Sequence, residues 1–98
     1  MLELRPTCEH CNKDLPADAV DAFICSFECT FCQSCSQGCL AKICPNCSGE
    51  LVRRPVRPAS ALAKFPASSN IVYKPVDMNQ HKKLISRLES IGKSQHDE

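Results

Sequence analysis

The chain has 98 residues, with 12 Lys and Arg against 11 Asp and Glu, no Trp and nine cysteines. No apolar run approaches the ~20 residues that a membrane helix needs. All nine cysteines lie between Cys8 and Cys47, so we expect the ordered unit to span only about fifty residues, a size at which a hydrophobic core is marginal without metals, disulfides or oligomerisation. The composition therefore favours one small domain stabilised by metal or by cross-links.

Charge is divided unevenly along the chain. Residues 1–50 carry three Lys and Arg against seven Asp and Glu, a net charge of −4, whereas residues 51–98 carry nine against four, a net charge of +5. Each zinc ion held by four thiolates would add about −2 to the first half. This argues against a phosphate-binding surface on the cysteine-rich part, while the second half stays basic.

Residues 1–54 are predicted to form the metal-binding module. Cys8–Cys11 and Cys44–Cys47 are expected to be knuckle-type turns, in which two thiolates converge on one metal, with a positive φ at Gly49 after the second knuckle. The regular elements expected within the module are a strand at Ala22–Cys25, two to three helical turns at Gln33–Lys42 and a closing strand at Leu51–Arg53.

The second half is predicted to consist of a linker, a helix and a tail. Four prolines punctuate residues 55–76, so this segment should be extended or irregular, with a possible single turn at Ser60–Lys64 and a possible β-addition segment at Ile71–Lys74. Residues 77–92 are predicted to form an amphipathic helix capped by Asp77 or Asn79, and residues 93–98 a disordered tail. The apolar stripe of the helix comprises Met78, Leu84, Ile85, Leu88 and Ile91.

Eight of the nine cysteines form four closely spaced pairs, in the pattern C-x2-C-x13-C-x3-C-x2-C-x2-C-x8-C-x2-C. This is ligand spacing for two tetrahedral zinc sites with four cysteines each. Disulfides are the alternative. They are disfavoured because the N-terminus lacks a secretory signal, because a reducing cytoplasm, the location we expect, favours metal thiolates, and because nine is an odd number.

The four pairs can share two metals sequentially or crosswise, and the two-residue gap between Cys29 and Cys32 permits both. The eight residues between Cys35 and Cys44 leave little room for a hairpin within a site but suffice for one short helix, so the crossed arrangement is favoured. The predicted ligands are, for site 1, Cys8, Cys11, Cys32 and Cys35, and for site 2, Cys25, Cys29, Cys44 and Cys47.

Two resemblances accompany this pattern. The spacing, with Phe-Cys-x-x-Cys at Phe31–Cys35 and Cys-Pro-x-Cys at Cys44–Cys47, resembles a RING finger with all-cysteine ligands. Over residues 1–75, the runs MLELRPTCEHCNKDLP, ICSFECTFCQSC, CPNCSGELVRRPVRPA and the later KP resemble a family of small bacterial proteins of unknown function, domain-of-unknown-function family 1272. This resemblance implies a zinc-ribbon or RING-like fold and supplies no activity.

The fold class predicted is a small metal-stabilised domain. It is a RING-like crossed two-zinc module with a short β-hairpin and one short α-helix, followed by an extended Pro-rich segment and a C-terminal helix.

The cysteine pattern also fits two other classes of protein, each less well. The run Cys29-x2-Cys32-x2-Cys35-x3-Cys39 matches that of a [4Fe–4S] ferredoxin, but Leu40 replaces the usual Pro, and five cysteines would stay unexplained. A RING-type ubiquitin ligase is disfavoured because the first knuckle holds Glu9 and His10 where an aliphatic residue is usual, and because the chain has no Trp.

The remaining candidate residues have plainer interpretations. His10 is expected to be a solvated side chain, His81 and His96 to lie on the surface, and Cys39 to be a half-buried free thiol. The basic segment with Arg53, Arg54 and Arg57 is expected to be a solvated linker, with contact to phosphates or an acidic partner as the alternative.

No catalytic constellation is evident, and sites closed by four thiolates leave no open position for catalysis. The sequence therefore predicts a non-enzymatic protein with two zinc ions, acting as a protein-interaction or adaptor module. The alternatives are weak nucleic-acid binding through the basic tail and iron–sulfur electron transfer. No membrane association is expected, and the oligomeric state stays open.

Overall fold

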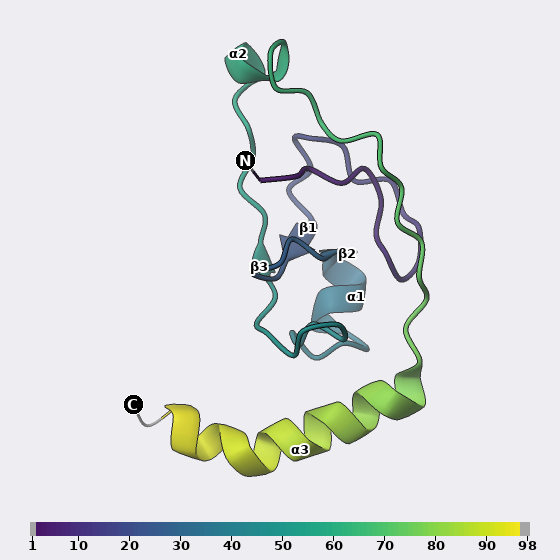
Figure 1. Cartoon of the computed structure of the whole chain (residues 1–98), viewed down its shortest axis with the longest axis vertical. Helices are drawn as coiled ribbons and strands as arrows, with labels where there is room; N and C mark the ends of the chain where they lie inside the picture. The colour runs from purple at the N-terminus through teal and green to yellow at the C-terminus, as the bar shows by residue number, and fades with distance from the viewer. Residues whose placement is uncertain (1, 97–98) are drawn as a thin grey trace.

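The computed structural model describes residues 2–96, and the side chains of residues 2–89. A small three-stranded sheet and one short helix lie at the centre, and a long helix crosses one side of this unit (Figure 1). The elements in chain order are β1 (Ala22–Ile24), β2 (Thr30–Cys32), α1 (Gln33–Gln37), β3 (Val52–Arg53), α2 (Ala59–Leu62) and α3 (Met78–His96).

The sheet has the order β2-β1-β3, and both pairings are antiparallel. Phe23 of β1 lies opposite Phe31 of β2 on one side and Arg53 of β3 on the other. The predicted hairpin is present. Its first strand, expected at Ala22–Cys25, and the closing strand, expected at Leu51–Arg53, are each one residue shorter than expected. Because β1 and β2 are joined by only five residues, the pairing places the two predicted cysteine pairs of this region at the ends of one hairpin.

Helix α1 is shorter than predicted. It ends at Gln37 instead of Lys42, because Gly38 leaves the helical region with φ −90° and ψ −104° while its N–H still donates to the carbonyl of Ser34. A Cβ at this glycine would lie 2.6 Å from the Ser34 oxygen, closer than side-chain carbons are found in real structures. The chain then turns back through Ala41 and Lys42, which both have positive φ.

The hydrophobic core consists of cysteines as much as of aliphatic and aromatic groups. Six of the twelve residues in the buried cluster are cysteines, and the largest fully buried apolar side chains among the other six are those of Phe31, Leu15 and Leu40. A core this small contributes little burial on its own, so the stability of the fold depends on how the sulfurs are held.

The Pro-rich segment follows the N-terminal segment back along the module (Figure 1). The backbone N–H of Ser68 donates to the carbonyl of Leu4 at 2.9 Å, and that of Lys74 to Glu9 at 2.7 Å. Helix α2 begins and ends slightly before the turn predicted there. Residues Ile71–Lys74 form no strand, and their backbone contact with the described part of the module is the Lys74 bond.

The basic segment with Arg53, Arg54 and Arg57 was expected to be a solvated linker, but it is not solvated throughout. Arg54 is 1% exposed, and its guanidinium donates to three backbone carbonyls, those of Arg5, Leu15 and Pro16. Arg57 donates to the carbonyls of Leu2 and Phe65. Both side chains are used to hold the N-terminal segment and the Pro-rich segment together, and Arg53 is the exposed member of the three.

Helix α3 is capped as predicted, because Asp77 Oδ1 accepts the N–H groups of Asn79 and Gln80. It runs to His96, past the predicted end at residue 92 and into the predicted tail, of which residues 97–98 lie outside the described part. The surface position predicted for His81 is wrong. This side chain is 2% exposed, and its Nε2 lies 2.8 Å from the carbonyl oxygen of Leu40.

Helix α3 thus docks on its own module at its first turn. The stripe residues Met78, Leu84, Ile85 and Leu88 are half-buried, while the side chains of Ile91 and His96 lie outside those described. Among the described helices, none combines the length and the apolar content that crossing a bilayer would require.

Candidate metal centre

Four cysteines of the first and third pairs converge on one point. The Sγ atoms of Cys8, Cys11, Cys32 and Cys35 all lie within 4.8 Å of one another. The first two come from a tight turn closed by Asn12, whose N–H donates to the Cys8 carbonyl and whose φ is +64°. Cys32 ends β2, and Cys35 lies one turn into α1. The hairpin and the helix thereby carry one pair to the other, which lies 21 residues earlier in the chain.

A second group forms at the other end of the hairpin. The sulfurs of Cys25, Cys44 and Cys47 lie within 4.8 Å of one another. In the second knuckle the N–H of Asn46 donates to Cys44 Sγ, and that of Gly49 to Cys47 Sγ, both at 3.4 Å. Such bonds from backbone to sulfur stabilise thiolates, which are the form that binds metal.

The positive φ expected at Gly49 belongs instead to Ser48, with φ +66°. Gly49 is suited to its position for another reason. A Cβ there would lie 3.2 Å from Cys47 Sγ, so a larger residue would crowd the sulfur that its own N–H approaches.

Cys29 is the predicted fourth member of site 2, and the structure places it beside that group but outside the 4.8 Å cluster. Its Sγ accepts a hydrogen bond from Asn46 Nδ2 at 3.5 Å, and its thiol interacts with those of Cys25 and Cys44. The structure thus brings together the first pair with the third and the second with the fourth, with Cys29 at the margin. The ligand sets themselves stay predictions.

Crowding of sulfurs shows in their acidity. Burial raises the pKa of the Cys35 and Cys44 thiols, and the neighbouring thiolates raise it further. For Cys25 burial acts in the same direction, but hydrogen bonds from the N–H groups of Phe27 and Cys29 and with the thiols of Cys29 and Cys47 together lower the pKa below its usual value. Several negative charges in so small a volume repel one another, and a dication would reverse that effect. The donor set fits zinc, which thiolates bind tetrahedrally.

The ninth cysteine, Cys39, was expected to be half-buried but is exposed, and it is not isolated. A ring nitrogen of His10 and the sulfurs of Cys35 and Cys39 lie within 4.8 Å of one another. The expectation that His10 is solvated is wrong, because it is half-buried and its Nδ1 accepts the N–H of Val76 at 2.9 Å. The spacing of the cysteines could not have predicted the hydrogen bond of His10, because its partner Val76 lies 66 residues away in the chain.

A buried carboxylate inside the first knuckle was also missed. Glu9 is 2% exposed, and its Oε2 accepts the N–H of Thr30 and the guanidinium of Arg5, both at 2.7 Å. It joins the knuckle to the start of β2. A charged residue between two ligands is usually solvated, so only the return of β2 beside the knuckle identifies this role.

These features define a class: a small cysteine-rich protein whose sulfurs gather in groups that could hold metal ions. The chain belongs to the family described as "Protein of unknown function (DUF1272)", which matches residues 1–57. It is 64% identical over 75 residues to an uncharacterised protein of Rhizobium meliloti (strain 1021), and the match covers 76% of this chain and 89% of that relative. No solved structure matches the chain. The sequence-based assignment to this family is confirmed.

Proposed function

We propose that this protein is a non-enzymatic zinc-binding module that holds two zinc ions and recognises another protein. The observation that carries the proposal is the convergence of cysteine pairs remote in sequence into two separate sulfur groups. The proposed ligand sets are the predicted ones, in a RING-like crossed arrangement. Cys29 would join site 2 through a small shift of its side chain toward the three clustered sulfurs.

The chemistry of such sites is structural. Four thiolates complete the tetrahedral shell of zinc and leave no position for a substrate or an activated water molecule. Each ion would instead contribute folding free energy, an apparent ~10–16 kcal/mol in zinc-finger peptides. This compensates for the small core described above.

Elemental analysis tests this part of the proposal, with two zinc ions expected per chain. Cys8→Ser and Cys25→Ser should each remove one ion, whereas Cys39→Ser, outside both predicted sets, should retain two. A brown, iron-containing protein would contradict the zinc assignment and support the iron–sulfur alternative. Retention of both ions by Cys8→Ser would refute the ligand set.

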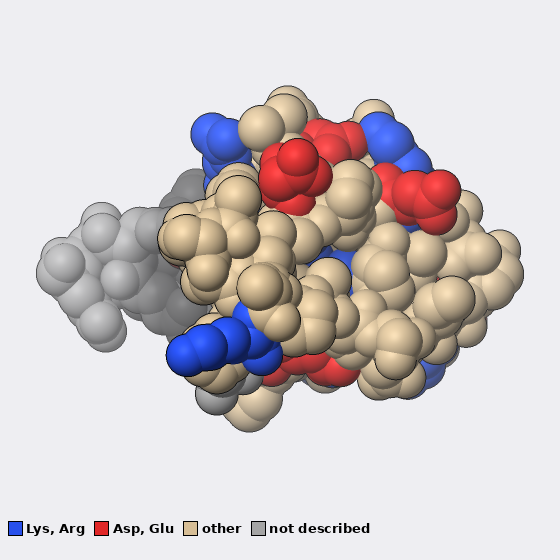
Figure 2. All heavy atoms as spheres, turned by 90° about the horizontal axis from the view of Figure 1, so that it is seen from above, with Lys and Arg blue, Asp and Glu red and all other residues tan. Residues whose placement is uncertain are grey.

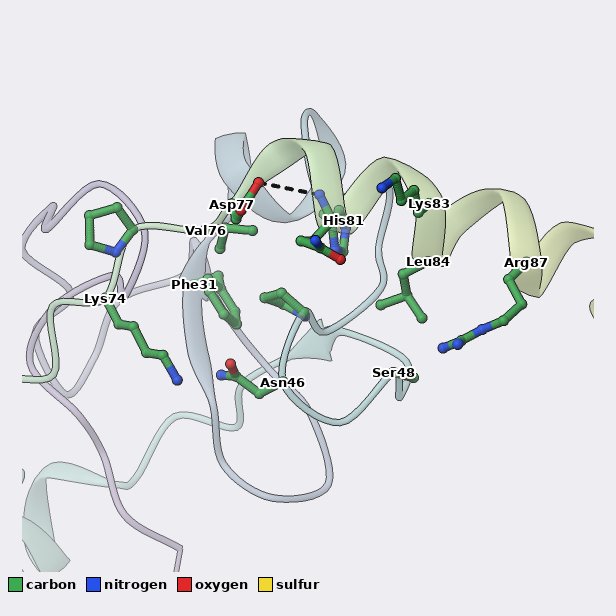
Figure 3. Close-up of a pocket in the computed structure, with 13 residues that line it drawn as sticks. Phe31, Asn46, Ser48, Lys74, Val76, Asp77, His81, Lys83, Leu84 and Arg87 are labelled. Carbon is green, nitrogen blue, oxygen red and sulfur yellow. Dashed lines mark hydrogen bonds between the residues drawn. The ribbon is translucent and has the colours of Figure 1, made fainter.

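A cavity of about 590 Å³ between α3 and the second knuckle is the candidate interaction site (Figure 3). Its apolar lining includes Pro45, Val76 and Leu84, and the cations Lys74, Lys83 and Arg87 also line it. In Figure 3, Leu84 points from α3 toward the loop that carries Ser48, with Lys74 and Arg87 on opposite sides.

The charge of this cavity indicates its occupant. Three cations line it against one carboxylate, Asp77, which already accepts the two capping bonds of α3. Among the described residues, neither Lys74 nor Lys83 forms an ion pair. The face seen from the α2 end differs, since cationic and acidic side chains alternate there without a continuous patch of one sign (Figure 2). An acidic peptide with apolar side chains complements the cavity in both charge and polarity.

A short synthetic peptide of alternating Glu and Leu, titrated into ¹⁵N-labelled protein, tests this site. Shifts should be confined to the amides around the cavity, weaken with salt and be lost in Lys83→Glu. The matched control is Lys82→Glu, which reverses the same charge one position away on an exposed residue that does not line the cavity. Equal loss in both variants, or binding only to an RNA oligonucleotide, would overturn the choice of partner.

A further inference from the structure

The ninth cysteine is placed beside a predicted zinc ligand. Cys39 is exposed, whereas Cys35 is only 9% exposed, and the two sulfurs lie within 4.8 Å of each other. The Cys39 thiol already lies against the backbone of its neighbour, because its Sγ is 3.8 Å from the Cys35 carbonyl oxygen. Cys39 belongs to neither predicted ligand set, and Cys35 belongs to that of site 1. Within the described residues, a non-ligand thiol therefore lies close to a predicted ligand here.

The local backbone allows these two sulfurs to bond. The sulfurs of Cys35 and Cys39 already lie within 4.8 Å of each other, so rotation of the exposed Cys39 side chain can bring them to the ~2 Å separation of a disulfide. Helix α1 ends at Gln37, between the two cysteines. Cys39 therefore lies in the turn that follows the helix. Its side chain can move toward Cys35 without breaking the backbone hydrogen bonds of α1.

We propose that Cys39 is a site of oxidation by hydrogen peroxide, and that it then forms a disulfide with Cys35 that removes one ligand from site 1. In the first step the peroxide O–O bond breaks and an S–O bond forms, giving the Cys39 sulfenic acid and water. In the second step Cys35 sulfur attacks the Cys39 sulfur. The S–S bond forms, the S–O bond breaks and Cys35 leaves the metal, while hydroxide takes a proton from solvent and departs as water.

Overall, the Cys39 thiol and the Cys35 thiolate form one disulfide, and one hydrogen peroxide with one solvent proton and the thiol proton becomes two molecules of water. Oxidation starts at Cys39 because exposure favours it and because it lies outside both predicted ligand sets. The consequence for the metal, which rests on the proposed function, is that three thiolates remain at site 1 and zinc binding there weakens. Site 2 keeps all its cysteines.

The test treats the purified zinc-loaded protein with hydrogen peroxide and follows two readouts. Alkylation of the remaining thiols and tandem mass spectrometry should show Cys35 and Cys39 joined, with a loss of two hydrogens. A chromophoric chelator should detect release of one zinc ion of the two. Cys39→Ser should bind both ions before treatment and release zinc more slowly than the wild type by about tenfold or more.

Equal release rates for the wild type and Cys39→Ser would overturn the proposal, as would a disulfide joining other cysteines or Cys39 recovered only as sulfinic acid. Zinc is measured before peroxide is added, which separates this inference from the proposed function. A protein that lacks zinc but forms the Cys35–Cys39 bond would refute the zinc assignment and leave the oxidation site standing.

Discussion

Arg54 offers the sharpest test of how the N-terminal segment is held. In the structure its guanidinium is buried and donates to the carbonyls of Arg5 at 2.9 Å, Leu15 at 3.3 Å and Pro16 at 3.0 Å. Burial lowers the pKa of this group, and the Asp21 carboxylate partly opposes that shift. Arg54→Ala would remove the donor and leave three carbonyls without it.

The magnitude follows from the number and type of these bonds. A hydrogen bond from a charged group contributes about 1.5–3 kcal/mol, but burying the guanidinium costs part of the sum. A buried acceptor left without its donor costs about 1–3 kcal/mol, so three carbonyls, offset by that burial cost, give a net loss of about 3–5 kcal/mol. We expect a loss of this size in the free energy of unfolding, a large share of the total of about 5–15 kcal/mol for a natural domain.

Urea unfolding of the zinc-loaded proteins, at fixed zinc concentration, measures this difference. Arg53→Ala is the matched control. Arg53 is the neighbour of Arg54 but its side chain is exposed, so its removal should change the free energy of unfolding by no more than about 0.5 kcal/mol. If the two variants unfold at the same urea concentration, the three bonds do not hold the N-terminal segment, and the reasoning fails.

Three further predictions concern other parts of the fold. His81→Ala should loosen α3 from the module, seen as faster amide hydrogen exchange in its first turns with both zinc ions retained; unchanged exchange would contradict the docking. Gly38→Ala should lower the melting temperature, because the added Cβ meets a backbone oxygen at 2.6 Å, and an equal or higher value would disprove this clash. The pKa of Glu3 is lowered by its hydrogen bonds with Arg5 and Ser68. The ionised Glu3 therefore stabilises the fold fully above pH 4.5, the ordinary pKa of this group, and this stabilisation is lost as the pH falls through the lowered pKa. Glu3→Gln should therefore show a shallower loss of stability on acidification, and identical pH profiles would count against this role.

Much of the local structure could be predicted because its determinants are close in sequence. A Cys-x-x-Cys turn needs only a few residues to bring two sulfurs together, and Asp77 caps α3 through bonds to residues two and three positions on. The same reasoning overestimated α1, since the helical propensity of Gln33–Lys42 was outweighed by the turn at Gly38. It also placed the positive φ at Gly49, one residue too late. The N–H of Gly49 donates to Cys47 Sγ, and Ser48 takes the positive φ.

The sequence by itself determined the grouping of cysteines into pairs and the alternation of elements between them. The tertiary structure alone decided the fate of Arg54, His81 and His10, which sequence reasoning placed in solvent. Each is buried or half-buried by a partner 38 to 66 residues away. Polar side chains are solvated unless the chain returns to supply a hydrogen bond that replaces water. For Arg54 that return depends on the pairing of β3 with β1, and for His10 and His81 on the path of residues 55–76 around the module. The spacing of residues along the chain does not predict that path. For cysteines separated by two residues, in contrast, the short turn between them determines how close their sulfurs lie.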